Sequence, residues 1–114
     1  MTLDDQCVSI HPYFRIPVER EQEVMELCQQ FVDHSSQEYL CLYNGFFKVG
    51  EILQCREGYR GSGGALAHLD NVGDWLQTFL QICELTKLEV HGSREEIEIL
   101  RPALTALPVV FFEL

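Results

Sequence analysis

The sequence predicts an α+β protein of the ferredoxin-like class, in which helices cover one face of an antiparallel sheet in a split β-α-β arrangement. Two observations predict it. Segments with strand-like alternation and segments with helical spacing of apolar residues follow one another as β-α-β-β-α-β, with an additional helix and tail. Turn residues separate these segments, and no repeat or linker interrupts the order. At this length we expect one domain that spans residues 1–114.

Composition narrows the classes of function. Hydrophobic residues make up 46% of the chain and charged residues 23%, as in ordinary globular proteins. The formal net charge of -10 repels polyanions, so we expect neither nucleic acid nor an anionic membrane surface as a partner. The chain has no apolar run of membrane-spanning length and begins with an acidic segment. We therefore expect a cytoplasmic protein.

Two elements are predicted at the start of the chain. Residues 7–17 alternate and are rich in β-branched and aromatic residues, which predicts a strand that ends at Pro17. Residues 18–36 carry apolar side chains at i, i+3, i+4 and i+7, which predicts an amphipathic helix over one face of a sheet.

Two further strands follow. Residues 38–49 form an aromatic-rich run interrupted by Asn44-Gly45, which is either a hairpin turn or a bulge. We favour the bulge, because Gly50 is better placed for the hairpin. In the next strand, residues 49–59, alternation puts one carboxylate on the same face as apolar neighbours; the residues of that face are Leu53, Cys55, Glu57 and Tyr59.

The second half of the chain starts with a long helical pattern. Residues 65–84 keep a helical period, although Asp70-Asn71 and Gly73 should divide the run into a short helix and a longer one. Residues 85–92 then read as a strand.

The last helix has a clear start and end. An S-x-x-E capping box that begins at Ser93 precedes the helix at residues 94–104, and Pro102 and Pro108 should end it. The apolar tail, residues 109–114, predicts a short strand.

A glycine-rich stretch, "REGYRGSGGALAHL" at residues 56–69, lies between a strand-like and a helix-like run. A dinucleotide site would need a third glycine where Leu66 stands, and no Gly-Lys-Ser/Thr follows for a phosphate loop. We predict a corner whose glycines supply positive φ and whose Ser62 caps the next helix, rather than a nucleotide site.

The strand at residues 38–49 carries apolar side chains on both of its faces. A small sheet with helices on one side and an apolar surface on the other needs a second partner to cover it. We expect a homodimer through the open sheet face, in which two sheets pair into an α+β barrel.

The cysteines and histidines do not indicate a metal centre. The five cysteines are odd in number, lie mostly in apolar patterns and contain no C-x-x-C, so we expect reduced core residues. No pair of histidines has i, i+4 spacing, so no metal site is predicted. Cys41 and Cys55, on adjacent predicted strands, could face one another, but the acidic composition disfavours a reactive thiol.

Three segments resemble the antibiotic-biosynthesis-monooxygenase-like superfamily of dimeric α+β barrels. "EGY" followed by "ALAHL" is similar to that family's E-x-Y/W and A-L-x-x-H segment, "SSQEYLCLY" (residues 35–43) to its segment before the second strand, and "VHGSREEIEILRPALTALP" to its C-terminal part. The resemblance implies a pocket between sheet and helices in each protomer, and cofactor-free oxygenation of aromatic polyketides or quinols in some members. Haem-degrading members use Asn, Trp and His, but Asn44, Trp75 and His68 occur here in a different order, so no cofactor is expected.

The candidate site residues follow from this pocket. Glu57 and His68 are the candidate catalytic pair, because a carboxylate in apolar surroundings and a histidine can both act as acid or base near neutral pH. Four residues could orient a ligand by hydrogen bonding and stacking: Tyr43, Asn44, Tyr59 and Trp75.

Two functions remain open from the sequence. One is an enzyme that acts on a small apolar compound, such as a quinone, a polyketide-like ring or a fatty acyl molecule. The other is a non-catalytic ligand-binding or structural homodimer. Under the second, Glu57 pairs with Arg56 or Arg60 or caps the next helix, His68 is a structural histidine, and Trp75 belongs to the core.

Overall fold

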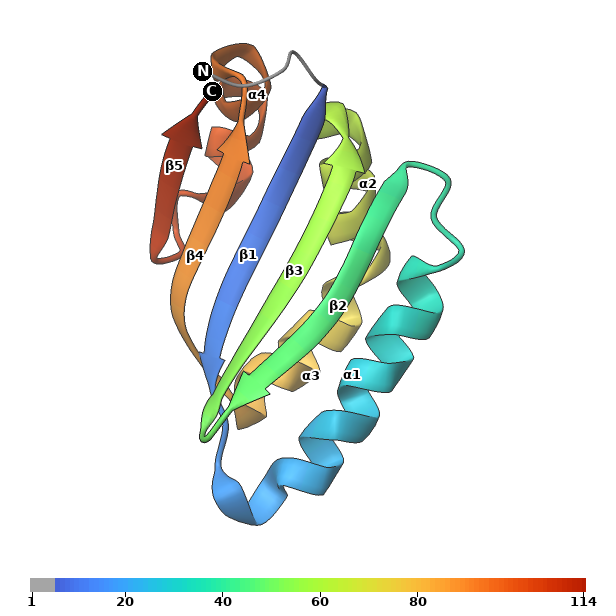
Figure 1. The fold of residues 1–114 in the computed structure, drawn as a ribbon, viewed down its shortest axis with the longest axis vertical. Coiled ribbons are helices and arrows are strands. Elements are labelled where there is room, and N and C mark those ends of the chain that lie inside the picture. Colours follow the sequence, from blue (N-terminus) through green and yellow to red (C-terminus); the bar gives the residue numbers. More distant parts are fainter. Residues whose placement is uncertain (1–5) are drawn as a thin grey trace.

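Residues 6–114 are described by the computed structural model, which contains in that range a five-stranded sheet and four α-helices (Figure 1). The strands are β1 (Cys7–Arg15), β2 (Cys41–Val49), β3 (Ile52–Arg60), β4 (Glu84–Gly92) and β5 (Val109–Glu113). The helices are α1 (Glu21–Ser35), α2 (Gly61–Asn71), α3 (Gly73–Ile82) and α4 (Arg94–Leu104), with a short 3-10 turn, η1 (Val18–Arg20), before α1. All the helices lie on one face of the sheet, behind it in Figure 1.

The sheet order is β2-β3-β1-β4-β5, which confirms the ferredoxin-like arrangement and extends it by one strand. The first four strands pair antiparallel, whereas β5 runs parallel to β4. The antiparallel sheet predicted for the ferredoxin-like core is confirmed, and the tail strand, for which no direction was predicted, adds to it in parallel. The reason is the crossover through α4, which carries the chain back to the end at which β4 began.

The β2–β3 hairpin turns at Gly50, whose φ of 58° confirms its predicted role. The predicted bulge is displaced. The register shifts between Cys41 and Tyr43, whereas Asn44 and Gly45 continue the regular ladder. A bulge earlier in β2 changes which of its side chains point toward the helices.

The glycine corner becomes the start of α2. Gly61 has a φ of 70°, so the chain turns directly from β3 into the helix, four residues before the predicted start at residue 65. Ser62 therefore lies in the first turn and its side chain is not the cap. Its backbone N–H instead donates to the carboxylate of Glu96 on α4 over 2.6 Å.

The other helix boundaries follow the sequence closely. The pattern over residues 65–84 divides into α2 and α3 beside Gly73, and α4 has its predicted bounds. The expected short helix and longer helix are wrong in their lengths, because the early start at Gly61 gives α2 11 residues against 10 in α3. Ser93 is the N-cap of α4, with its Oγ accepting from the Glu96 N–H over 3.4 Å. Pro102 lies inside the last turn of α4, so it does not end the helix as expected.

The core fills the space between the sheet and the helices, whereas the opposite sheet face is uncovered within this chain. Cys28, Cys55 and Cys83 are buried, as expected of core thiols, but Cys7 and Cys41 are only partly buried. Over residues 6–114, no helix has both the length and the apolar character to span a membrane. The cytoplasmic location stays a prediction.

Candidate functional site

Strand β3 directs one carboxylate into the interior. Leu53, Cys55, Glu57 and Tyr59 are all buried on the face that the helices cover, which confirms their predicted common face. Arg56 and Arg60 are exposed. The alternative in which Glu57 pairs with these arginines is therefore wrong, because Arg56 projects from the other face and Glu57 has interior partners.

Glu57 is 4% exposed and is held by three side chains. The Tyr59 hydroxyl donates to Oε1 over 2.7 Å, and the Cys55 thiol donates to Oε2 over 3.0 Å. His68 Nε2 lies 3.2 Å from Oε1. A buried carboxylate requires such partners, because desolvation without them would be very costly.

His68 connects this carboxylate to a second one. The α2 helix starts directly after β3, so His68, two turns into the helix, lies over Glu57. Its Nδ1 is 3.0 and 2.9 Å from the two carboxylate oxygens of Glu38, in the turn before β2. Asn71 Nδ2 donates to Glu38 over 2.9 Å. Glu38, His68 and Glu57 thus form a continuous cluster that runs from the partly exposed Glu38 to the buried Glu57, and we call it the Glu-His-Glu cluster.

The protonation of His68 reflects both carboxylates. Burial alone would lower the pKa of His68, but the hydrogen bond and the charge of Glu57, followed by those of Glu38, outweigh it and raise the pKa above its usual value. Burial and the nearby Glu57 also raise the pKa of Cys55 and of Tyr59 far above their usual values. These two groups therefore stay protonated and donate to Glu57, while the imidazole readily takes up a proton.

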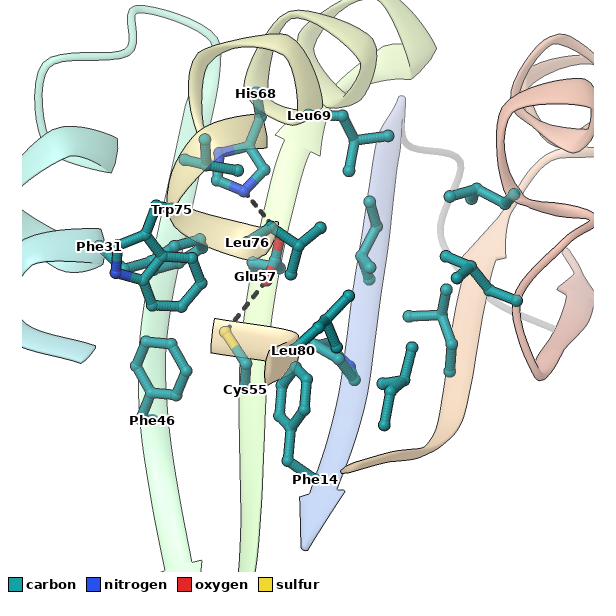
Figure 2. A pocket seen from close by; sticks show the side chains of 17 residues that line it. Phe14, Phe31, Phe46, Cys55, Glu57, His68, Leu69, Trp75, Leu76 and Leu80 are labelled. Carbon is teal, nitrogen blue, oxygen red and sulfur yellow. Dashed lines mark hydrogen bonds and ion pairs between the residues drawn. The ribbon is translucent and has the colours of Figure 1, made fainter. Parts of the chain in front are cut away.

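An apolar cavity of about 70 Å³ adjoins the cluster (Figure 2). Its lining is hydrophobic apart from Glu57, His68 and the Cys55 thiol, and comes from both the sheet and the helices. Leu80 on α3 lines the cavity and is 38% exposed, so the cavity approaches the surface beside α3. A carboxylate and an imidazole at the wall of an apolar cavity can transfer protons to a bound molecule.

The four predicted ligand-binding residues lie in different surroundings. Trp75 lines the cavity and donates its Nε1–H to the Leu27 carbonyl over 2.6 Å. Tyr59 is fully buried and contacts Glu57 rather than the cavity. Asn44 pairs with Glu57 across the β2–β3 ladder, and within residues 6–114 its buried Nδ2 lacks a hydrogen-bond partner.

Tyr43 does not join this site. It is 38% exposed on the opposite face of the sheet, where its ring lies 5.1 Å from the guanidinium carbon of Arg56. Cys41 and Cys55 are not opposite one another either, because Cys41 pairs with Tyr59 and Cys55 pairs with Phe46.

Glu38 is the site residue that sequence reasoning missed. It belongs to the "SSQEYLCLY" segment, but its place in a turn gave no periodicity from which its direction could be inferred. The common face of Glu57 and Tyr59 could be predicted from the sequence because both residues lie in a strand whose side chains alternate between the two faces. Among residues 6–114, no group of three or more His, Cys, Asp or Glu side chains is arranged to hold a metal ion.

The sheet order and the one-sided helices are those of ferredoxin-like α+β proteins. MupZ from Pseudomonas fluorescens, a solved structure, is 34% identical to this chain with a TM-score of 0.92, and the match covers 96% of this chain and 91% of MupZ. The chain belongs to the antibiotic-biosynthesis-monooxygenase-like superfamily.

Two more distant structures share the fold. A conserved protein from Methanosarcina mazei is 18% identical with a TM-score of 0.69, covering 75% of this chain and 90% of that one. An antibiotic biosynthesis monooxygenase is 16% identical to this chain with a TM-score of 0.64. The match covers 73% of this chain and 92% of that one. No protein-family model matches the sequence, and a search of curated proteins gives no match.

Proposed function

We propose that this protein is an acid–base catalyst that acts on a small apolar molecule in the cavity beside Glu57. The observation that carries the proposal is the contact between Glu57 and His68, 3.2 Å apart at the wall of an otherwise hydrophobic cavity. General acid–base catalysis by positioned side chains contributes about 10²- to 10⁴-fold to rates, and it requires this proximity.

Each member of the Glu-His-Glu cluster has a distinct part. Glu57 lines the cavity and takes a proton from the bound molecule. His68, whose pKa is raised, carries positive charge that balances Glu57 and returns the proton. Glu38 orients the imidazole through Nδ1 and, being partly exposed, connects the cluster to solvent.

The reaction that best suits this arrangement is removal of a proton from a phenol or from the carbon beside a ketone. The resulting enolate is electron-rich enough to react with dioxygen without a metal or a flavin. The name of the structural neighbour described as an antibiotic biosynthesis monooxygenase agrees with such a reaction. Polyketide-like rings and fatty acyl compounds that carry a C–H bond beside a carbonyl group fall within this substrate range, whereas a quinone does so only as the reduced quinol, which has phenolic hydroxyls.

Exchange of carbon-bound hydrogen for deuterium tests the proposal even while the natural substrate is unidentified. Aliphatic and cyclic ketones are incubated with the protein in deuterated buffer, and the exchange is followed by NMR. We expect the wild type to accelerate exchange of at least one ketone and Glu57→Gln to slow it by at least about 10²-fold. Glu26→Gln, which changes an exposed carboxylate, is the matched control and should match the wild type. If Glu57→Gln exchanges as fast as the control, Glu57 is not the base.

A non-catalytic ligand-binding protein is the second candidate. It is favoured by the three side-chain partners that already hold Glu57. Under this alternative, a ketone binds in the cavity but its exchange rate stays at the background level.

We also propose that the protein forms a homodimer through the open sheet face. Large apolar side chains of this face are exposed, which is unfavourable for an isolated protomer; they include Tyr43, Phe47, Val49, Ile52, Val110 and Phe112. Light scattering at micromolar concentration should give twice the chain mass of 13.2 kDa. A mass equal to that of one chain would contradict the dimer.

A further inference from the structure

The cavity has two walls of different chemistry (Figure 2). On one side of Glu57 the lining is aromatic, and it includes Phe31, Phe46 and Trp75. On the other side it is mostly aliphatic, although Phe14 lies there beside Leu80. Seven leucines line the cavity, from α2, α3, β4, α4 and the segment that follows α4. The leucine wall is therefore assembled from four elements and from the segment after α4.

The aromatic side chains already have aromatic partners. Phe31 packs edge to face on Phe46, with ring centroids 5.2 Å apart, and lies 4.6 Å from Trp75. Trp75 stacks on Phe79 at 4.7 Å, and its N–H is bonded to the Leu27 carbonyl. A planar ligand would gain little from stacking here, because these rings are occupied with one another.

The leucines can make strong hydrophobic contacts with a ligand, and such contacts do not require a particular orientation. Aliphatic side chains gain free energy in proportion to the apolar area they bury, and a flexible alkyl chain can follow an irregular wall. Burial of each additional methylene contributes ~0.8 kcal/mol, which corresponds to an about fourfold gain in affinity. The leucine wall thus favours an aliphatic chain over a rigid ring.

The polar part of the cavity wall, at Glu57 and His68, selects the charge of the ligand. Glu57 is an acceptor toward Tyr59 and Cys55, and an ionised carboxylate has about four acceptor positions, so it can also accept from a ligand hydroxyl. The Glu-His-Glu cluster contains two carboxylates and one imidazole. Together with a chain charge of -10, it repels an anionic head group.

We propose that the cavity binds a neutral, unbranched aliphatic compound, with its chain along the leucine wall and a hydroxyl or carbonyl group at Glu57 and His68. This specificity rests on the ligand site of the proposed function, but it does not depend on catalysis. It selects the acyl-type compounds from the wider range of quinones, polyketide-like rings and fatty acyl molecules.

Four probes separate chain shape from head-group charge. They are 1-hexanol, 1-octanol, octanoate and 2-naphthol. Each is titrated at neutral pH by calorimetry and by tryptophan fluorescence. Trp75 is the single tryptophan of the chain and lines the cavity, so its fluorescence should report binding there. We expect 1-octanol to bind more than tenfold tighter than 1-hexanol, and octanoate and 2-naphthol to bind at least tenfold weaker than 1-octanol.

Three variants locate the binding. Leu76→Phe fills part of the leucine wall and should weaken 1-octanol at least tenfold, whereas Ile99→Phe on the exposed side of α4 should leave it unchanged. Glu57→Gln removes charge from the polar part of the cavity wall, so it should raise the affinity for octanoate relative to 1-octanol. Thermal melts of each variant confirm that it is folded.

The outcomes distinguish this proposal from the wider function. Tighter binding of 2-naphthol, or of octanoate by the wild type, would overturn the aliphatic and neutral specificity while leaving a ligand site in place. Equal effects of Leu76→Phe and Ile99→Phe would show that the leucine wall does not bind the chain. If none of the four probes binds, the aliphatic specificity fails, and exchange of a cyclic ketone then decides whether the proposed function survives it.

Discussion

Glu57 on β3 and His68 on α2 are in contact, with Oε1 and Nε2 3.2 Å apart and only 4% and 1% of the two residues exposed. The contact follows from the direct passage of β3 into α2 at Gly61, which brings the first turns of the helix back over the strand. It joins a buried carboxylate to a buried imidazole at the wall of an apolar cavity. Changes to the groups that support this pair should therefore alter stability and titration in defined directions.

Tyr59→Phe tests how strongly Glu57 depends on its donors. The substitution removes the hydroxyl that donates to Oε1 over 2.7 Å and leaves the ring in place. Hydrogen bonds to charged groups contribute ~1.5–3 kcal/mol, so we expect the free energy of unfolding to fall by about that amount. Urea denaturation measures it, with Tyr39→Phe as the control because Tyr39 is 90% exposed. Equal stability of the two variants would contradict the account of Glu57.

The pH dependence of stability tests His68. Its folded pKa is raised, so its contribution to stability is fully present below the unfolded value of about 6.5 and is lost as pH rises through the folded pKa. We expect the free energy of unfolding to decline across that window by up to ~1.4 kcal/mol per pH unit. Urea denaturation at a series of pH values measures the decline, and His68→Gln should lack it. The same decline in His68→Gln would show that another group causes it.

Glu38→Gln distinguishes the contribution of Glu38 to the raised pKa of His68 from that of Glu57. It removes one of the charges that raise the His68 pKa, so the ring should titrate at lower pH in an NMR experiment than it does in the wild type. Glu26→Gln, on the exposed side of α1, should leave the titration unchanged. An unchanged His68 titration in Glu38→Gln would mean that Glu38 does not act on the ring.

Two neighbouring glycines of α2 should respond in opposite directions to alanine. An added Cβ at Gly63 meets nothing within 4 Å, so Gly63→Ala should stabilise the protein by ~0.5–1 kcal/mol through helix propensity. At Gly64 the Cβ would lie 2.9 Å from the Leu40 Cβ and 3.3 Å from both the Leu40 carbonyl oxygen and the Tyr59 Cβ. Such overpacking costs ~1–3 kcal/mol. Thermal denaturation measures both variants. If both were more stable than the wild type, the close packing of α2 on β3 would be contradicted.

Glu96→Gln tests the contact between α4 and the start of α2. Hydrogen bonds from the Ser62 side chain and backbone lower the pKa of Glu96. Glu96 therefore contributes to the stability of the fold above its unfolded pKa, and this contribution is lost as pH falls through the folded pKa. We expect Glu96→Gln to lower stability at neutral pH by ~1 kcal/mol, as for other carboxylates at helix N-termini. Glu95→Gln, the exposed neighbour, is the control. The difference between the two variants should disappear in acid, and a difference that grew in acid would be inconsistent with this role.

Much of the fold was predictable because local patterns agree with it. The alternation around Glu57, the hairpin at Gly50 and the cap at Ser93 each have a short-range cause that can be read from the residues alone. The start of α2 was predicted too late, because the left-handed conformation of Gly61 permits an abrupt strand-to-helix turn that composition does not reveal.

The site was less predictable, since its assembly depends on contacts between distant segments. Glu57 and His68 were assigned from their own chemistry, but Glu38 reaches His68 only through the packing of a turn against α2. Tyr43 was assigned to the pocket but faces away from it. The register shift between Cys41 and Tyr43 decides this direction, because a slip of one residue moves a side chain to the other face of a sheet.

Glu57 and His68 should act on a bound ketone as one proton-transferring pair, and a double-mutant cycle tests this most directly. The measurement is the rate of solvent-deuterium incorporation by the wild type, Glu57→Gln, His68→Gln and the double variant. If the pair acts as a unit, each single variant and the double variant will lose rate by a similar factor of about 10² or more. Unchanged rates in the single variants, or independent losses that multiply in the double variant, would contradict a shared role for Glu57 and His68.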